Sequence, residues 1–133
     1  MTGVADGLAT AHEANILHRD VKPENILVAK NGYAKLADFG LAKLVENAEI
    51  DLTRTLREGA TQKGVIIGTI PYMSPEQASG QRLDSRSDIF SFAIVLYELL
   101  AGRRPFHGST NLEVLETIIH AAPKPLGGES LRV

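Results

Sequence analysis

Residues 86–101 limit most strongly how this chain can fold. Asp84 or Ser85 before this stretch and Gly102 after it are residue types that begin and end helices. Apolar side chains occur around most of its helical circumference, not along one stripe, namely Ile89, Phe90, Phe92, Ala93, Ile94, Val95, Leu96, Leu99 and Leu100. A helix of this kind needs other elements around it. The sequence therefore predicts a buried helix over 86–101, closely packed by the rest of the chain.

Composition narrows the class of protein further. The chain has 133 residues, of which 44% are hydrophobic and 23% charged, as expected for one globular domain or part of a larger one. A net charge of −2 without a basic block gives no reason to expect nucleic acid or an anionic membrane as a partner. The absence of cysteine excludes disulfides and fits a reducing cytoplasm. The most apolar stretch, 89–101, is too short to span a bilayer, so we expect no membrane segment.

The remaining pattern predicts a mainly α fold with one small β-hairpin. Helical spacing predicts helices over about 2–14 and 110–121, and a short helix that begins at Ser74 and Pro75. Two short strands, 26–28 and 35–37, flank Asn31-Gly32, which is a strong turn signal. Residues 41–73 are predicted to form a long, mostly irregular segment, and such segments inside a compact domain are usually functional.

Three polar groups of different chemistry lie close together in the run His-Arg-Asp-Val-Lys-Pro-Glu-Asn-Ile-Leu-Val at 18–28. They are the carboxylate of Asp20, the ammonium of Lys22 and the amide of Asn25. A second carboxylate, Asp38, follows one short hairpin later. The set suits in-line phosphoryl transfer, because it offers a base for a hydroxyl, a cation for the phosphate and oxygen ligands for Mg²⁺.

Four motifs in this order resemble the C-terminal lobe of eukaryotic-like protein kinases. They are His18-Arg19-Asp20-x-Lys22-Pro23-Glu24-Asn25, Asp38-Phe39-Gly40, Gly68-Thr69-x-x-Tyr72-Met73-Ser74-Pro75-Glu76 and the helix opening at Asp88. Lys22 and Gly68-Thr69 are similar to the serine/threonine branch, and the run from Gly68 to Ala78 is similar to bacterial members. The resemblance implies a partial kinase domain over 1–122 without an N-lobe or the last C-lobe helices. A frayed tail is expected over 123–133.

The resemblance also implies roles for the residues of the first two motifs. Asp20 would orient the substrate hydroxyl and accept its proton, and Lys22 would contact the γ-phosphate; the alternatives are a loop-capping aspartate and a surface lysine. Asn25 and Asp38 would hold Mg²⁺. ATP would contact Lys22, Glu24, Asn25, Leu27 and Asp38, with Leu27 in the floor beneath the adenine ring.

Regulatory residues are implied in the same way. Arg19 marks kinases that are activated by phosphorylation within the segment 41–73, because arginine binds phosphate bidentately. Thr61 is the predicted acceptor, with Thr53 and Thr55 as alternatives. Thr69 is expected to bond Asp20 and Lys22.

Five further residues are assigned structural roles. The resemblance implies that His18 stacks on Phe39, beside Gly40, and that Asp88 accepts backbone N–H groups from the His18–Arg19 turn. Glu76 is expected to lack a partner, which would leave residues 73–77 loosely held. The remaining histidines follow no common pattern, so solvated or capping roles are expected for His12, His107 and His120.

The function implied is that of a serine/threonine protein kinase region, with ATP and Mg²⁺ as cofactors and a protein Ser/Thr hydroxyl as acceptor. The sequence contains no Gly-rich phosphate loop, so little or no activity is expected of this chain alone, and poor solubility is expected. One alternative is a non-catalytic kinase-like module that captures a substrate or a partner kinase through the surface of 41–122. A small phosphotransferase of another kind ranks last, because nothing in the sequence replaces the missing segments that would cover the nucleotide.

Overall fold

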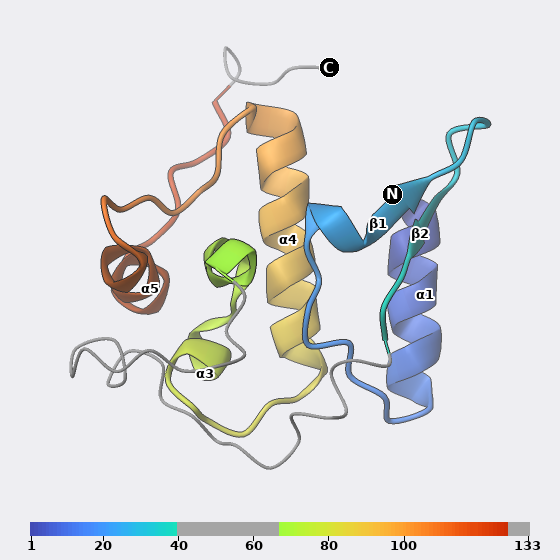
Figure 1. The fold of residues 1–133 in the computed structure, drawn as a ribbon, viewed down its shortest axis with the longest axis horizontal. Coiled ribbons are helices and arrows are strands. Elements are labelled where there is room, and N and C mark those ends of the chain that lie inside the picture. Colours follow the sequence, from blue (N-terminus) through green and yellow to red (C-terminus); the bar gives the residue numbers. More distant parts are fainter. Residues whose placement is uncertain (40–66, 128–133) are drawn as a thin grey trace.

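The computed structural model of the chain describes residues 1–39 and 67–127. Figure 1 shows α4 at the centre, with the first helix and the hairpin on one side and α3 and α5 on the other. The predicted mainly helical fold with one small hairpin is confirmed. In chain order, the elements are α1 (Thr2–Glu13), η1 (Pro23–Asn25), β1 (Ile26–Val28), β2 (Ala34–Leu36), η3 (Ile67–Tyr72), α3 (Pro75–Ala78), α4 (Ser85–Ala101) and α5 (Asn111–His120).

The central helix α4 ends at the predicted residue and begins at Ser85, one residue before the predicted start, with Asp84 as its cap. Asp84 caps it by accepting a hydrogen bond from the Arg86 N–H at 2.9 Å, and Gly102 closes it in the left-handed conformation with φ 69°. Within the part of the chain that the structure describes, cover of this helix is incomplete. Ile94 and Val95 are buried, whereas Ile89 and Leu99 are 55% and 57% exposed.

Buried side chains form two clusters on either side of α4. The smaller cluster joins α1 to the hairpin and to Val21 of the intervening loop, and it consists of Val4, Leu8, Val21 and Ala34. The larger cluster joins η3, α3, α4 and α5, and it consists of Ile70, Tyr72, Met73, Ala78, Ile94, Val95, Phe106, Leu115 and Ile118. Val21 and Ile70 adjoin polar residues, so the two clusters fix the segments that carry the candidate site.

The hairpin pairs two antiparallel strands in the register Ile26↔Leu36, Leu27↔Lys35 and Val28↔Ala34. Its turn contains Gly32 at φ 81°, as the Asn31-Gly32 signal predicts. The second strand begins and ends one residue earlier than predicted. The Ala37 N–H still donates to the Asn25 carbonyl at 2.8 Å in the same register, but Asn25 belongs to the 3₁₀ turn η1, so the paired strands end at Ile26 and Leu36.

The short helix α3 is held by a capping box. The Ser74 hydroxyl accepts the Gln77 N–H at 3.2 Å, and the Gln77 side chain accepts the Ser74 N–H at 3.1 Å. The expectation that Glu76 lacks a partner is wrong, because the Ser87 hydroxyl donates to its Oε2 at 3.0 Å. Residues 73–77 are thus tied down by their own cap and by α4, contrary to the loose packing expected.

Replacing Ser74 by alanine should lower the free energy of unfolding by about 1–2 kcal/mol. The variant loses the cap of α3 and also the bond from the Ser74 hydroxyl to Ser87 at 3.1 Å inside the core. Urea denaturation followed by circular dichroism measures the change. Ser109→Ala, at an exposed position, is the control; an equal loss in both variants would contradict the assignment.

The described ranges contain no helix with the length and apolarity needed to cross a membrane.

Candidate active site

Four polar side chains from two distant segments meet in one hydrogen-bonded network. Lys22 Nζ donates to the Thr69 hydroxyl at 2.9 Å, and that hydroxyl donates to Asp20 Oδ1 at 3.1 Å. Asn25 Nδ2 donates to Asp20 Oδ2 at 3.1 Å and to the Asp20 carbonyl at 2.8 Å. Lys22 Nζ also lies 3.5 Å from Asp20 Oδ2. The predicted contacts of Thr69 with Asp20 and Lys22 are therefore present.

The network holds the Asp20 carboxylate in one orientation and leaves it accessible. Lys22 and Asn25 are buried, whereas the Asp20 side chain is 30% exposed. Each carboxylate oxygen has a neutral hydrogen-bond donor, so rotation of the group would break a bond. A partly exposed carboxylate with fixed orientation and an adjacent ammonium is suited to receive a proton from a hydroxyl that approaches from solvent.

Local folding explains how these side chains converge. Val21 is buried in the cluster with α1 and the hairpin, and it places its neighbours Asp20 and Lys22. The 3₁₀ turn η1 starts at Pro23 and brings Asn25 back toward Asp20 through the Asn25 N–H to Lys22 carbonyl bond at 3.0 Å. Thr69 is supplied by η3.

The loop backbone before Asp20 is fastened to the first turn of α4. Asp88, which is 2% exposed, accepts the N–H of His18 through Oδ2 and the N–H of Arg19 through Oδ1, both at 2.8 Å. These are the bonds that the sequence predicted for Asp88. Arg19 has φ 69°, and its carbonyl accepts a bond from Gln77 Nε2 at 2.8 Å, so α3 holds the same turn from its other side.

A third donor to Asp88 was missed from the sequence. His12 Nε2 lies 2.7 Å from Asp88 Oδ2, so the expectation of a merely solvated or capping His12 is wrong. Its spacing contained a signal, because positions 4, 8 and 12 share one face of a helix, and Val4 and Leu8 are buried there. The partner could not be read from the sequence, since Asp88 lies 76 residues further along the chain.

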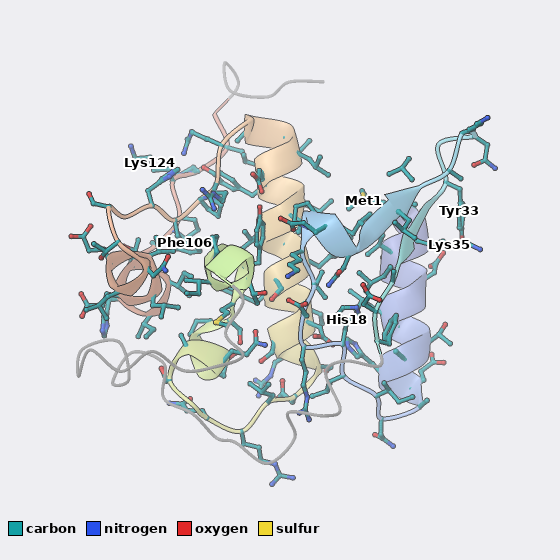
Figure 2. All side chains as sticks on the ribbon, viewed as in Figure 1. Met1, His18, Tyr33, Lys35, Phe106 and Lys124 are labelled. Atoms are coloured by element: carbon teal, nitrogen blue, oxygen red, sulfur yellow. The ribbon has the colours of Figure 1, made fainter. Side chains whose placement is uncertain are left out.

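His18 is fully buried and lies in the interior between α1 and α4, where Figure 2 labels it. Its ring meets Phe39 edge to face with 4.5 Å between the ring centroids, so the predicted contact between the two rings is present. Its Nδ1 accepts the Asp20 N–H at 3.1 Å, which leaves Nε2–H to donate to the Ala37 carbonyl at 2.7 Å. With both nitrogens engaged, His18 supports the loop and is not available as a base.

The residues predicted to hold Mg²⁺ are only partly brought together. Asn25 uses its Nδ2 for Asp20, which leaves its Oδ1 as a neutral oxygen ligand of the type that Mg²⁺ accepts. Asp38 is exposed and has φ 63°. Its link to Asn25 is indirect, because the N–H of the preceding residue, Ala37, donates to the Asn25 carbonyl. Among the described residues, the Asp38 side chain makes no hydrogen bond to Asp20 or Asn25. No group of three His, Cys, Asp or Glu side chains is placed for a metal in the described segments either.

The other predicted residues fall into two groups. Leu27 is 62% exposed on β1, so the surface expected to contact adenine is open, and Glu24 is also exposed. Outside the described residues lie Gly40 and the predicted phosphorylation sites Thr53, Thr55 and Thr61.

A hollow of about 360 Å³, lined by residues of η1, η3 and the start of α5, was not foreseen from the sequence. Glu24, two residues after Lys22, lines it together with Tyr72, which follows Thr69 by three positions, and with Arg104. The Tyr72 hydroxyl donates to Glu98 Oε2 at 2.6 Å, and burial together with this carboxylate raises the pKa of Tyr72 well above its usual range. Tyr72 is therefore a neutral donor at any physiological pH.

Comparison with known proteins agrees with these features. The protein kinase domain family model matches residues 1–126. Serine/threonine-protein kinase PknL of Mycobacterium tuberculosis is 48% identical over 111 residues, which are 84% of this chain and 25% of PknL. PknA of Corynebacterium glutamicum, another serine/threonine-protein kinase, is 43% identical over 92% of this chain and 24% of its own length. Serine/threonine-protein kinase pkn2 of Myxococcus xanthus is 43% identical over 92% of this chain and 14% of its own length.

The chain thus spans about a quarter or less of the length of these relatives. The family match nevertheless covers nearly all of its residues, and the motifs on which the sequence prediction depended lie inside the matched range. The chain belongs to the bacterial-type family of eukaryotic-like serine/threonine protein kinase domains.

Proposed function

We propose that this chain provides the catalytic loop and the substrate side of a serine/threonine protein kinase that acts in the cytoplasm. The observation that carries the proposal is the network in which Thr69 and Asn25 orient the Asp20 carboxylate beside the Lys22 ammonium. In the proposed reaction, the acceptor hydroxyl oxygen forms a bond to the γ-phosphorus and the bond to ADP breaks. Asp20 takes the hydroxyl proton, and Lys22 offsets the negative charge of the transferring group.

Nucleotide and metal binding are assigned by the same reasoning. Asn25 Oδ1 and the Asp38 carboxylate are the proposed oxygen ligands, and Mg²⁺ held there would neutralise phosphate charge. Leu27 is the proposed adenine contact on this side of the nucleotide. Glu24 also lines the hollow of about 360 Å³, which is the proposed place for residues that flank the acceptor hydroxyl in a protein substrate.

We also propose control by phosphorylation. Arg19 lies directly before Asp20 and is the proposed ligand for a phosphothreonine, with Thr61 as the acceptor. Such a bond would link the segment 41–73 to the catalytic loop. The non-catalytic alternative, a module that captures a substrate or partner kinase, predicts the same fold but no phosphoryl transfer.

The 133-residue chain alone should transfer phosphate slowly or not at all. Its sequence offers no Gly-rich loop to cover the nucleotide, and Leu27 faces solvent, so only part of the positioning that this reaction needs is present. The test replaces the matching segment of PknL with residues 1–126 to give a chimeric kinase. Transfer of radiolabelled phosphate from ATP to serine and threonine in a protein substrate is then measured for the chimera and for the chain.

Activity of the chimera together with inactivity of the chain supports the proposal. A chimera that melts cooperatively yet transfers no phosphate would favour the non-catalytic alternative. Rapid transfer by the chain alone would show that the nucleotide is positioned by other means.

A further inference from the structure

We propose that Gln77 is a positioning residue of the kinase site, because its side-chain amide fixes the peptide unit that leads into Asp20. Gln77 Nε2 donates to the Arg19 carbonyl at 2.8 Å, and Gln77 Oε1 accepts the Ser74 N–H at 3.1 Å. One side chain therefore connects the cap of α3 with the loop that carries the proposed general base. The two contacts are independent of any activity, whereas their importance for phosphoryl transfer rests on the proposed function.

The chemistry of the two partners fixes how the amide is oriented. A backbone N–H can only donate and a carbonyl can only accept, so exchange of Oε1 and Nε2 would place two donors together at one end and two acceptors together at the other. The base of the side chain is restrained as well, because the Gln77 N–H donates to the Ser74 hydroxyl at 3.2 Å. Neither an ionised glutamate, which lacks the donor, nor an apolar residue could make both contacts from this position.

The Arg19 carbonyl belongs to the same planar peptide unit as the Asp20 N–H. Gln77 Nε2 binds the carbonyl, and His18 Nδ1 accepts the N–H at 3.1 Å, so this peptide unit is held at both of its polar groups. Its rotation would redirect the Cα–Cβ bond of Asp20 and with it the carboxylate. Restraint is needed here because Arg19 has φ 69°, in the left-handed region that a non-glycine residue occupies only when its surroundings hold it there.

The other end of the amide leads to the second half of the catalytic network. Ser74 is separated from η3 by Met73 alone, and η3 supplies Thr69, whose hydroxyl donates to Asp20 Oδ1 at 3.1 Å. Met73 is buried in one cluster with side chains of η3, so Ser74 and Thr69 belong to one packed segment. Gln77 thus holds this segment and the backbone of Asp20 in a fixed relation, which keeps the carboxylate within reach of the Thr69 hydroxyl.

The test compares three variants of the full chain by residue-resolved hydrogen–deuterium exchange at low micromolar concentration. Gln77→Glu keeps the size of the side chain and an oxygen for the Ser74 N–H, as in an ordinary capping box, but its ionised carboxylate cannot donate to the Arg19 carbonyl. Gln77→Met removes both contacts. Gln81→Glu is the control, because it introduces the same charge four residues later at an exposed position.

We expect exchange at the Asp20 amide to accelerate about tenfold in Gln77→Glu, because its peptide unit loses one of the two bonds that hold it. The Ser74 amide should keep its protection in this variant, whereas both amides should exchange faster in Gln77→Met. Neither should change in Gln81→Glu. Unchanged exchange at Asp20 in Gln77→Glu, or faster exchange spread equally over α1, α4 and α5, would overturn the proposal.

The chimeric kinase supplies the second readout. Gln77→Glu should lower kcat about 10- to 100-fold, the size of effect that a small misplacement of a catalytic group can have. The KM for ATP should stay close to that of the parent, because both partners of the side chain, Ser74 and Arg19, lie outside the proposed ATP and Mg²⁺ ligands. An equal loss of kcat in Gln81→Glu, or a raised KM for ATP with kcat unchanged, would contradict the proposal. If the parent chimera is inactive, the proposed function fails, and the exchange experiment still decides the role of Gln77.

Discussion

Asp20→Asn is expected to lower phosphoryl transfer by the chimeric kinase about 10²- to 10⁴-fold, the usual contribution of a general base. Asparagine keeps the size of the side chain and one oxygen acceptor for the Thr69 or Asn25 donor. It cannot take up the proton of the acceptor hydroxyl. The KM for ATP should change far less than kcat, because Asp20 is not among the proposed nucleotide ligands.

Single-turnover transfer to a protein substrate gives the rate, and a thermal melt shows whether the variant is folded. Asp6→Asn, at an exposed position on α1, serves as the matched control and should retain the parent rate. A folded Asp20→Asn chimera that keeps more than a tenth of the parent kcat would remove Asp20 from the proposed role.

Asp88→Ala should reduce the free energy of unfolding of the chain by about 3–5 kcal/mol, because it leaves several buried donors unsatisfied, each of which costs about 1–3 kcal/mol. The carboxylate is 2% exposed, and alanine would leave His12 and the N–H groups of His18 and Arg19 without their acceptor. Domains of this size are typically stable by about 5–15 kcal/mol, so a large share of the total would be lost.

Urea denaturation followed by circular dichroism measures this effect. Asp84→Ala is the matched control, because Asp84 caps the same helix from an exposed position and pairs with Arg86 at the surface. Asp84→Ala should lower the free energy of unfolding clearly less than Asp88→Ala does. Equal losses at positions 84 and 88 would show that the buried carboxylate has no special part in the fold.

Much of the fold could be predicted because its signals are local. The cap residues Asp84 and Gly102 fix both ends of α4, and Ser74 with Pro75 fixes the start of α3. The Asn31-Gly32 turn likewise sets the hairpin. In each of these cases, the residues that decide the conformation are neighbours in the sequence, so no knowledge of tertiary packing is needed.

Within the site, only the contacts between residues of the recognised motifs could be predicted from the sequence. Contacts of Thr69 with Asp20 and of Asp88 with the loop followed from the resemblance, and both are present. The contacts His12–Asp88 and Glu76–Ser87 depend on how α1 and α3 pack against α4, which no local pattern specifies. The end of β2 was misplaced for a related reason, because the partner strand begins only after the 3₁₀ turn η1, at Ile26.

The attachment of residues 18 and 19 to Asp88 has a consequence for regulation. Asp88 belongs to the central helix of the fold. If the turn before Asp20 changed shape, the buried Asp88 carboxylate would lose the two N–H groups that it binds. Inactivation would therefore cost the least free energy if this turn kept its shape and segments held by fewer bonds moved instead. The proposed general base would then keep one position, and control would act by admitting or excluding the molecules that meet it.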